Sequence, residues 1–200
     1  MKIMKKSKII SLLAIAIIII AIFPYRGIRF SLNPEVQEGD VIFHMSTSSQ
    51  SPLVAIATLS PLTHCGVIVM KGDEPYVLEA SSTLKTTPLR TFIKSGRCGA
   101  YWIKRPKSGV DKRILYGHLL GRSYDLSFSF DNNKYYCSEL VYDIYKYQLG
   151  IELCSPKTIS HYITFGMKKK MRQRGMDPNG LVVTPDDVFS SKILKSVYKN

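Results

Sequence analysis

Residues 135–150 read YYCSELVYDIYKYQLG, which places a cysteine at the start of a segment with helical spacing. The apolar residues at i, i+1, i+4 and i+7 are Leu140, Val141, Ile144 and Tyr147. Gly150 follows where a helix would stop, so residues 137–149 are the clearest helix predicted in the chain. Unpaired amides and the dipole at a helix start stabilise a thiolate, which makes Cys137 a candidate nucleophile. The backbone amides of Cys137 and Ser138 are candidate donors to an oxyanion.

The segments before this helix have the character of strands and turns. Short apolar runs next to turn residues predict strands at 41–43, 65–70, 76–80 and 100–104. Apolar spacing predicts further helices at 51–59 and 110–120. Thr184, Pro185 and Asp187 have the pattern of a helix start, with an N-cap, a first-turn proline and an acid. We therefore expect one α+β domain, a hairpin-rich antiparallel sheet with helices packed on it.

A cysteine nucleophile requires a base, and His64 is the best placed of the four histidines because it begins the strand 65–70. A hairpin with residues 71–74 as its loop pairs Met70 with Pro75. In that register Glu79 lies diagonal to His64 on the same face of the sheet. A shift of one residue would place Glu79 on the opposite face. A carboxylate in such a strand can also simply face water.

The N-terminus carries a basic head followed by an apolar run. Four lysines lie within residues 2–8, and residues 9–23 are apolar except for Ser11. This pattern predicts that residues 1–24 are a signal peptide or an uncleaved N-terminal membrane anchor. A helix over residues 9–23 would be about 22 Å long, which is short for a bilayer span. Either alternative predicts an extracytoplasmic domain, periplasmic, secreted or anchored to the bacterial membrane.

The charge of the chain is strongly basic. Its 200 residues include 28 basic and 15 acidic side chains, a net charge of +13. A basic cluster near the C-terminus is a candidate contact for an anionic membrane surface or an acidic wall polymer, or simply a solvated helix face. Its members are Lys168, Lys169, Lys170, Arg172 and Arg174. No nucleic-acid partner is expected, because the chain has no zinc-finger, RNA-binding or phosphate-loop motif.

The remaining cysteines indicate no metal site. Cys65, Cys98, Cys137 and Cys154 lack CxxC spacing, which argues against a zinc cage. Disulfides are the usual state of cysteines in exported proteins, and four cysteines allow three full pairings, among which the sequence does not choose. Strand alternation points Cys65 away from the face of His64, so we expect its thiol to be inert.

Five short motifs in this order resemble the YiiX-type branch of the permuted papain-like enzymes, within the NlpC/P60 superfamily. They are EGDVIF at 38–43, LTHCGV at 62–67, YVLEA at 76–80, YDLSF at 124–128 and YYCSEL at 135–140. The serine-rich run STSSQS at 46–51 belongs to the same resemblance. It covers roughly residues 35 to 190 and implies a circularly permuted papain-like domain over about 35–195. It also implies a catalytic triad of His64, Cys137 and Glu79. Relatives often carry a small or hydroxyl residue where this chain has Cys65.

These observations favour a thiol-dependent acyl hydrolase, an amidase or peptidase, that needs no metal or organic cofactor. Cell-wall peptides and lipid acyl groups are the substrate classes that the resemblance implies. Tyr124 and Tyr136 are candidates for the substrate cleft, although most aromatic residues belong to the core. The alternatives are an acyltransferase of the same fold and a non-catalytic envelope-binding protein that uses the basic surface.

Overall fold

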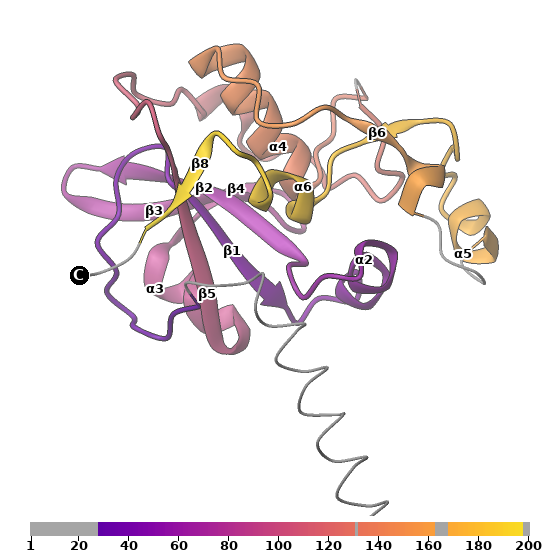
Figure 1. The fold of residues 1–200 in the computed structure, drawn as a ribbon, viewed down its shortest axis with the longest axis horizontal. Helices are drawn as coiled ribbons and strands as arrows, with labels where there is room; N and C mark the ends of the chain where they lie inside the picture. The colour runs from indigo at the N-terminus through magenta and orange to yellow at the C-terminus, as the bar shows by residue number, and fades with distance from the viewer. Residues whose placement is uncertain (1–27, 131, 163–167, 198–200) are drawn as a thin grey trace, which may run out of the picture.

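A six-stranded antiparallel sheet forms the centre of the computed structural model, which describes residues 28–130, 132–162 and 168–197. The strand order is β4-β3-β2-β1-β5-β8 (Figure 1). The strands are β1 Val41–Ser46, β2 His64–Lys71, β3 Glu74–Ala80, β4 Leu84–Pro88, β5 Gly96–Pro106 and β8 Leu194–Ser196. A separate two-stranded ribbon pairs β6 Lys157–Thr158 with β7 Leu181–Val182.

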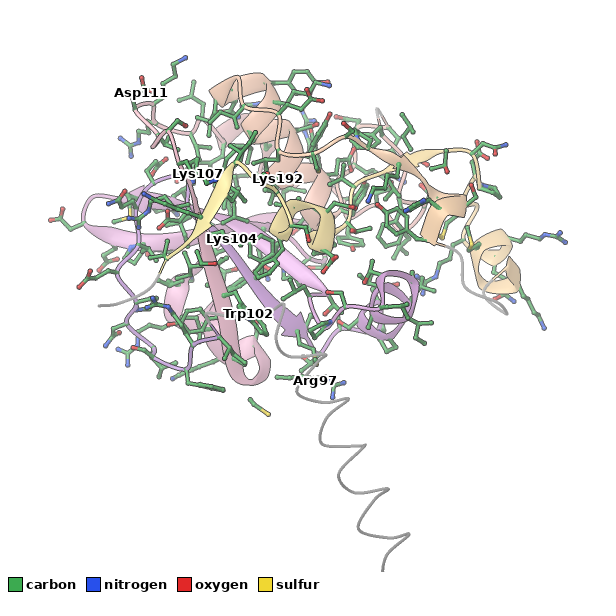
Figure 2. The ribbon with its side chains drawn as sticks, viewed as in Figure 1. Arg97, Trp102, Lys104, Lys107, Asp111 and Lys192 are labelled. Atoms are coloured by element: carbon green, nitrogen blue, oxygen red, sulfur yellow. The ribbon has the colours of Figure 1, made fainter. Side chains whose placement is uncertain are left out.

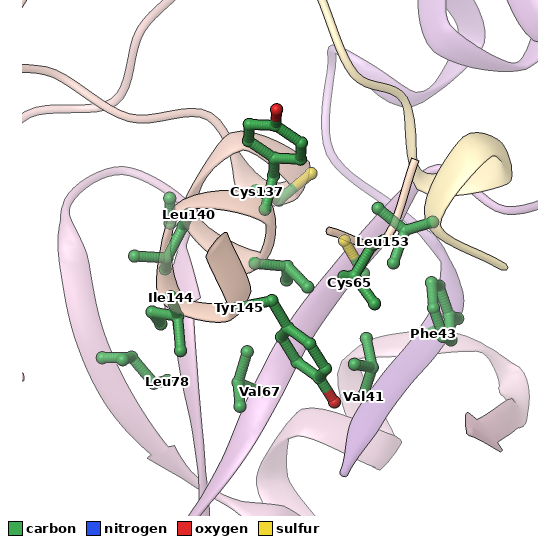
Figure 3. Close-up of a cluster of buried hydrophobic side chains, with 14 of the residues drawn as sticks. Val41, Phe43, Cys65, Val67, Leu78, Cys137, Leu140, Ile144, Tyr145 and Leu153 are labelled. Carbon is green, nitrogen blue, oxygen red and sulfur yellow. The ribbon is translucent and has the colours of Figure 1, made fainter. Parts of the chain in front are cut away.

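Helices cover both faces of this sheet. The two faces are covered by α4 Cys137–Asp143 and by α3 Leu89–Ser95. The other helices are α2 Ser51–Thr58, α5 Lys168–Gln173 and α6 Pro185–Phe189. Short helical turns are η2 Gly117–Leu119, η3 Ile144–Leu149 and η4 Ile159–Tyr162, and the π-helical η3 continues α4 directly. The larger apolar core lies under α4, where Cys137 and Leu140 meet Cys65 and Val67 of β2 (Figure 3). A second core lies under α3 and includes Ile68 and Phe92.

The β2–β3 hairpin has the register that the sequence predicts. Met70 pairs with Pro75, and the ladder continues to Val67 opposite Leu78. Lys71 also pairs with Glu74, so the loop is the two-residue turn Gly72–Asp73 rather than a four-residue loop. At Gly66 a Cβ atom would lie 2.5 Å from Val77 Cγ1 and 2.7 Å from the Leu78 carbonyl oxygen. Only glycine fits there, so Gly66 lets β3 approach β2 at the end of the ladder.

An ion pair links strand β5 to the residue that precedes strand β1. Arg105 on β5 donates from Nε and Nη2 to the Asp40 carboxylate, each at 2.7 Å. Tyr145 of η3 donates its hydroxyl to the Gly39 carbonyl, which ties the end of α4 to the same corner. Figure 2 shows Trp102 and Lys104 along β5, with Arg97 near one end of the strand and Lys107 beyond the other.

Most of the predicted elements are present, but the predicted helix over 110–120 is wrong. That segment is a loop with a single helical turn at η2. Glu38 accepts the Ile114 N–H and Gln148 accepts the Leu115 N–H, so tertiary hydrogen bonds replace the helical ones. The apolar spacing arises because Ile114 and Leu119 are buried separately, while Leu115 remains 68% exposed.

The helix start at Thr184 is confirmed. The Thr184 hydroxyl accepts the Asp187 N–H at 3.2 Å, and Asp187 in turn accepts the Thr184 N–H at 2.8 Å. This reciprocal capping box begins α6 at Pro185. Strands β4 and β8 and helix α3 are not predicted from the sequence, and they complete the sheet and one of its faces.

The N-terminal prediction for residues 1–24 falls outside the described residues. Within the part of the chain that is described, no helix has the length and apolar character needed to cross a membrane. The basic cluster lies on α5 and just after it, with Lys169 and Arg172 exposed. Its contact with an anionic surface stays a prediction.

We expect Leu78→Ala to lower the free energy of unfolding by about 3 kcal/mol, because it empties a fully buried position under α4. Leu115→Ala is the matched control and should change stability by less than about 0.5 kcal/mol, since Leu115 is exposed. Urea unfolding followed by circular dichroism measures both. Equal losses in the two variants would contradict this description of the core.

Candidate active site

His64 and Glu79 meet at the end of the β2–β3 hairpin. His64 Nε2 lies 2.6 Å from Glu79 Oε2, and both residues are buried. The second carboxylate oxygen, Oε1, accepts the Thr87 hydroxyl of β4 at 2.5 Å. With both oxygens bonded, the carboxylate cannot rotate freely. It therefore fixes the tautomer and the orientation of the imidazole ring and leaves Nδ1 for another partner.

Cys137 supplies that partner from the first turn of α4. Its side chain is buried, 4% exposed, and it is close enough to His64 for each group to shift the pKa of the other. The start of α4 is held in place by two contacts. Glu139 accepts the Tyr136 N–H at 3.2 Å, and the Ser138 hydroxyl donates to the Val183 carbonyl at 2.8 Å. The structure thus aligns Glu79, His64 and Cys137 in one hydrogen-bonded series.

Cys65 is not isolated from this series, contrary to the expectation that it is inert. Strand alternation does place Cys65 on the face opposite His64, but α4 packs on that face. The Cys65 side chain and backbone both hydrogen bond with Cys137. Cys65 is therefore a second contact of the Cys137 sulfur.

Electrostatics favour an ion pair between Cys137 and His64. The hydrogen bond with Cys65 is the largest influence and, with His64, lowers the pKa of Cys137 well below its ordinary value, although burial opposes this. Burial alone would lower the pKa of His64, but its hydrogen bonds to Cys137 and Glu79 raise it to about 10. Burial raises the pKa of Cys65, which keeps it a neutral thiol and a donor. Both shifts favour a thiolate at Cys137 beside an imidazolium at His64.

A second histidine supports the ring of the first. His44 on β1 pairs directly with His64, and the two ring centroids are 5.3 Å apart. The His44 ring stacks on Phe92 at 4.3 Å, and Phe92 also stacks on His64 at 5.5 Å. Burial, with the positive charge of His64, lowers the pKa of His44 to about 3, so it stays neutral. A Cβ at residue 96, which is glycine, would lie 2.7 Å from His44 Nδ1.

Two hollows adjoin the series from different sides. We call the first the apolar crevice, a narrow space of about 70 Å³ lined by Cys137 and Ser138 together with apolar side chains. Its apolar walls include Leu53, Val54, Ala57, Phe128, Met171 and Met176. We call the second the polar hollow, a wider space of about 470 Å³ lined by His64 and Glu79 but not by Cys137. Serines dominate its other walls: Ser46, Ser48, Ser49, Ser81, Ser82 and Ser123.

The other predicted site residues have separate places. Ser138 has its backbone in the first turn of α4, beside the sulfur, and lines the apolar crevice. Tyr124 lines the polar hollow. Tyr136, expected at the cleft, is instead buried at 1% exposure, and its hydroxyl accepts the Val183 N–H. Its ring packs against Phe128 and Phe130, which makes it part of the core.

All four cysteines are free thiols, so none of the three disulfide pairings is present. Among the described residues, no group of three or more histidine, cysteine or acidic side chains is arranged to hold a metal ion. Sequence reasoning missed Thr87, Phe92 and the role of His44. Thr87 pairs with Val77, two residues from Glu79, and without a predicted strand β4 this neighbourhood could not be inferred.

Residues 35–198 match the family described as permuted papain-like amidase enzymes, YaeF/YiiX, C92 family. The chain belongs to this family. The papain-like amidase class agrees with a cysteine on a helix start that faces a histidine on a strand. Membership assigns a cysteine hydrolase or amidase activity in general terms.

Two relatives from Escherichia coli show how far the similarity extends. The uncharacterized protein YiiX of strain K12 is 32% identical over 174 residues, which cover 82% of this chain and 86% of YiiX. A crystal structure from strain O157:H7, described as metalloprotein yiiX, matches with a TM-score of 0.75 at 32% identity. The match covers 82% of this chain and 97% of that one, and it supports the permuted papain-like fold.

The ion pair predicts an unusual pH profile for alkylation of Cys137. Because its pKa is lowered, the rate with iodoacetamide should stay nearly constant from about pH 6.5 to about pH 9, whereas an ordinary thiol gains about tenfold per unit below its pKa. Peptide mapping by mass spectrometry follows the modified cysteine. The same thiol in urea-unfolded protein is the control, and a rate that rises in parallel with that control would contradict the ion pair.

Cys65→Ala should shift this profile upward by about one pH unit, because it removes the thiol donor to the Cys137 sulfur. Cys65→Ser keeps a donor of similar size and should shift the profile much less. The measurement is the pH of half-maximal alkylation rate in each variant. If alanine and serine give the same profile as the wild type, the Cys65 hydrogen bond has no role in ionising Cys137.

Proposed function

We propose that this protein is a thiol-dependent acyl hydrolase, an amidase or esterase, that works through a triad of Cys137, His64 and Glu79. The observation that carries the proposal is the 2.6 Å contact of His64 with Glu79, next to a buried Cys137 whose pKa His64 helps to lower. Cys137 is the nucleophile, His64 the general base and acid, and Glu79 the residue that orients the ring.

The first half of the reaction forms a thioester. The Cys137 thiolate attacks the carbonyl carbon of the substrate, and the carbonyl electron pair moves to oxygen. Backbone amides at the start of α4, those of Cys137 and Ser138, stabilise the oxyanion. When the tetrahedral intermediate collapses, the bond from carbon to the leaving nitrogen or oxygen breaks. That atom takes the proton from His64 and departs as an amine or alcohol.

The second half returns the enzyme to its resting state. His64, now neutral, takes a proton from water as the water oxygen attacks the thioester carbon. The carbon–sulfur bond then breaks, its electron pair returns to Cys137, and the acid product leaves. The imidazolium and thiolate are restored together, which suits a site where both charged forms are favoured.

The apolar crevice favours an acyl group that is slender and apolar. It opens beside Cys137 and Ser138, where the acyl part of the thioester must lie, and its walls come from α2 and from the segments around η4 and α5. An alkyl chain or an aliphatic side chain of a peptide suits a space of about 70 Å³. With the leader or anchor that the sequence predicts for residues 1–24, this favours acyl groups of the cell envelope as substrates.

The free thiol of Cys137 favours an enzyme over a non-catalytic envelope-binding protein, in which a disulfide would block the sulfur. An acyltransferase would share the first half of the reaction and differ only in the acceptor. Release of free acid in the absence of any added alcohol or amine distinguishes the hydrolase.

Incubation with p-nitrophenyl octanoate should give an octanoyl adduct on Cys137, detected by intact-protein mass and peptide mapping. Cys137→Ser should give no thioester, whereas Cys98→Ser, the matched change at an exposed cysteine, should label as the wild type does. Glu79→Gln should slow acylation about 100-fold, because the ring of His64 loses its orienting carboxylate. Adducts that persist in Cys137→Ser would refute the proposed function.

A further inference from the structure

The polar hollow is lined by His64, the residue that protonates the leaving group in the proposed mechanism. It is lined by His64 and Glu79, whereas Cys137 and Ser138 line the apolar crevice. In acyl transfer the acyl carbon stays on sulfur, and the leaving atom takes its proton from the histidine. The two halves of a substrate are therefore assigned to different hollows, the acyl half to the apolar crevice and the leaving half to the polar hollow.

The walls of the polar hollow are built for hydrogen bonding. Four of them come from the serine-rich run 46–51, which follows β1: Ser46, Ser48, Ser49 and Gln50. Thr63 fixes this run, since it accepts the Ser46 N–H at 2.8 Å and donates to Ser51 Oγ at 3.2 Å. Ser48 Oγ in turn lies 3.2 Å from Ser51 Oγ. The hydroxyl network holds the run in one conformation against the start of β2.

Two polar atoms of this lining have no hydrogen-bond partner within the described part of the chain. They are Gln50 Oε1, from the serine-rich run, and Ser81 Oγ, just after β3. Both atoms are buried although their residues are only half-buried. Burying an unpaired polar atom costs free energy, so each atom gains a partner if its side chain turns toward a hydrogen-bonding group in the hollow.

The charges around the polar hollow disfavour an anionic group. Among its described lining residues there is no lysine or arginine, and the charged pair His64 and Glu79 is matched internally. The thiolate of Cys137 leaves the triad with a net negative charge. Lys85 and Arg174 act electrostatically on Glu79 and Tyr124, but neither side chain lines the hollow. A phosphate or carboxylate would lose its water there without a cation to replace it.

We propose that the polar hollow is the leaving-group subsite, and that it selects an uncharged, hydroxyl-bearing alcohol or amine. This assignment rests on the proposed function and adds its substrate class, an ester or amide of a slender apolar acyl group with a neutral polyol or amino alcohol. The serine-rich run and Ser81 then have a role in specificity, and Gln50 and Ser81 are the members with an unpaired polar atom.

Two esters with the same acyl group test the subsite. Monooctanoylglycerol should be hydrolysed by the full-length protein with a kcat/KM at least about tenfold higher than its glycerol phosphate counterpart. Octanoate release, measured by chromatography, gives both values. Equal rates, or a preference for the phosphate ester, would overturn the subsite even if p-nitrophenyl octanoate acylates Cys137 and so supports the proposed function.

Variants separate a direct contact from a general effect. Ser81→Ala and Gln50→Leu should each lower the ratio of kcat/KM for monooctanoylglycerol to that for p-nitrophenyl octanoate by about fivefold. Ser108→Ala, at an exposed serine away from the hollow, should leave the ratio unchanged. Leu126→Lys adds a cation at an exposed lining position and should raise hydrolysis of the phosphate ester several-fold. If neither Ser81→Ala nor Gln50→Leu changes the ratio of the two kcat/KM values, the assignment of the subsite is refuted.

Binding to Cys137→Ser gives a readout that does not depend on turnover. Monooctanoylglycerol should bind this variant about tenfold more tightly than its phosphate counterpart, as measured by calorimetry below the micelle concentration. The preference should shrink when Ser81→Ala is added. If the wild type forms no acyl adduct, the proposed function fails, while equal affinity for the two esters rejects the subsite independently.

Discussion

The register of the β2–β3 hairpin is the constraint on which the site depends. It places Glu79 2.6 Å from His64, and a slip of one residue would send the carboxylate to the other face of the sheet. Gly66 protects this register where the ladder ends, because any side chain there would collide with Val77 and with the Leu78 carbonyl. The backbone register therefore determines how Glu79 meets His64, the proposed catalytic base.

Burial strengthens the electrostatic interactions among Glu79, His64 and Cys137. Low exposure penalises an isolated charge, yet the pKa of His64 rises to about 10 because it has negative partners on two sides. The thiolate of Cys137 is likewise supported by more than the histidine, since Cys65 and the first turn of α4 also face the sulfur. The charges are stabilised as a group, so removal of one member changes the ionisation of the others.

The hairpin and the helix of Cys137 could be predicted from the sequence because both depend on local patterns. The apolar spacing predicted the helix that begins at Cys137, and Gly150 predicted where its continuation η3 ends. The positions of Met70 and Pro75 predicted the register of the hairpin. Contacts made by strand β4 and helix α3 could not be foreseen, since residues 84–95 show no clear period. Thr87 and Phe92 were therefore missed. At Cys65 the alternation was right, but the helix that covers that face belongs to a distant part of the chain.

The predicted helix over 110–120 failed for a related reason. Its apolar residues have helical spacing, yet Glu38 and Gln148, both remote in sequence, take the backbone N–H groups of Ile114 and Leu115. Spacing alone does not reveal such competition. The polar hollow is also formed by four separate segments of the chain. The sequence alone therefore does not show that its serines lie together.

The His44 ring, which stacks on Phe92, also lies against Gly96, a residue far from it in the chain. The His44 ring fills the space in which a side chain at position 96 would stand. A larger residue at 96 can arise during evolution only after the imidazole at 44 has been replaced by something smaller. Substitutions at residues 44 and 96 therefore depend on each other. The packing behind the His64 ring restricts which of these substitutions are tolerated and in what order.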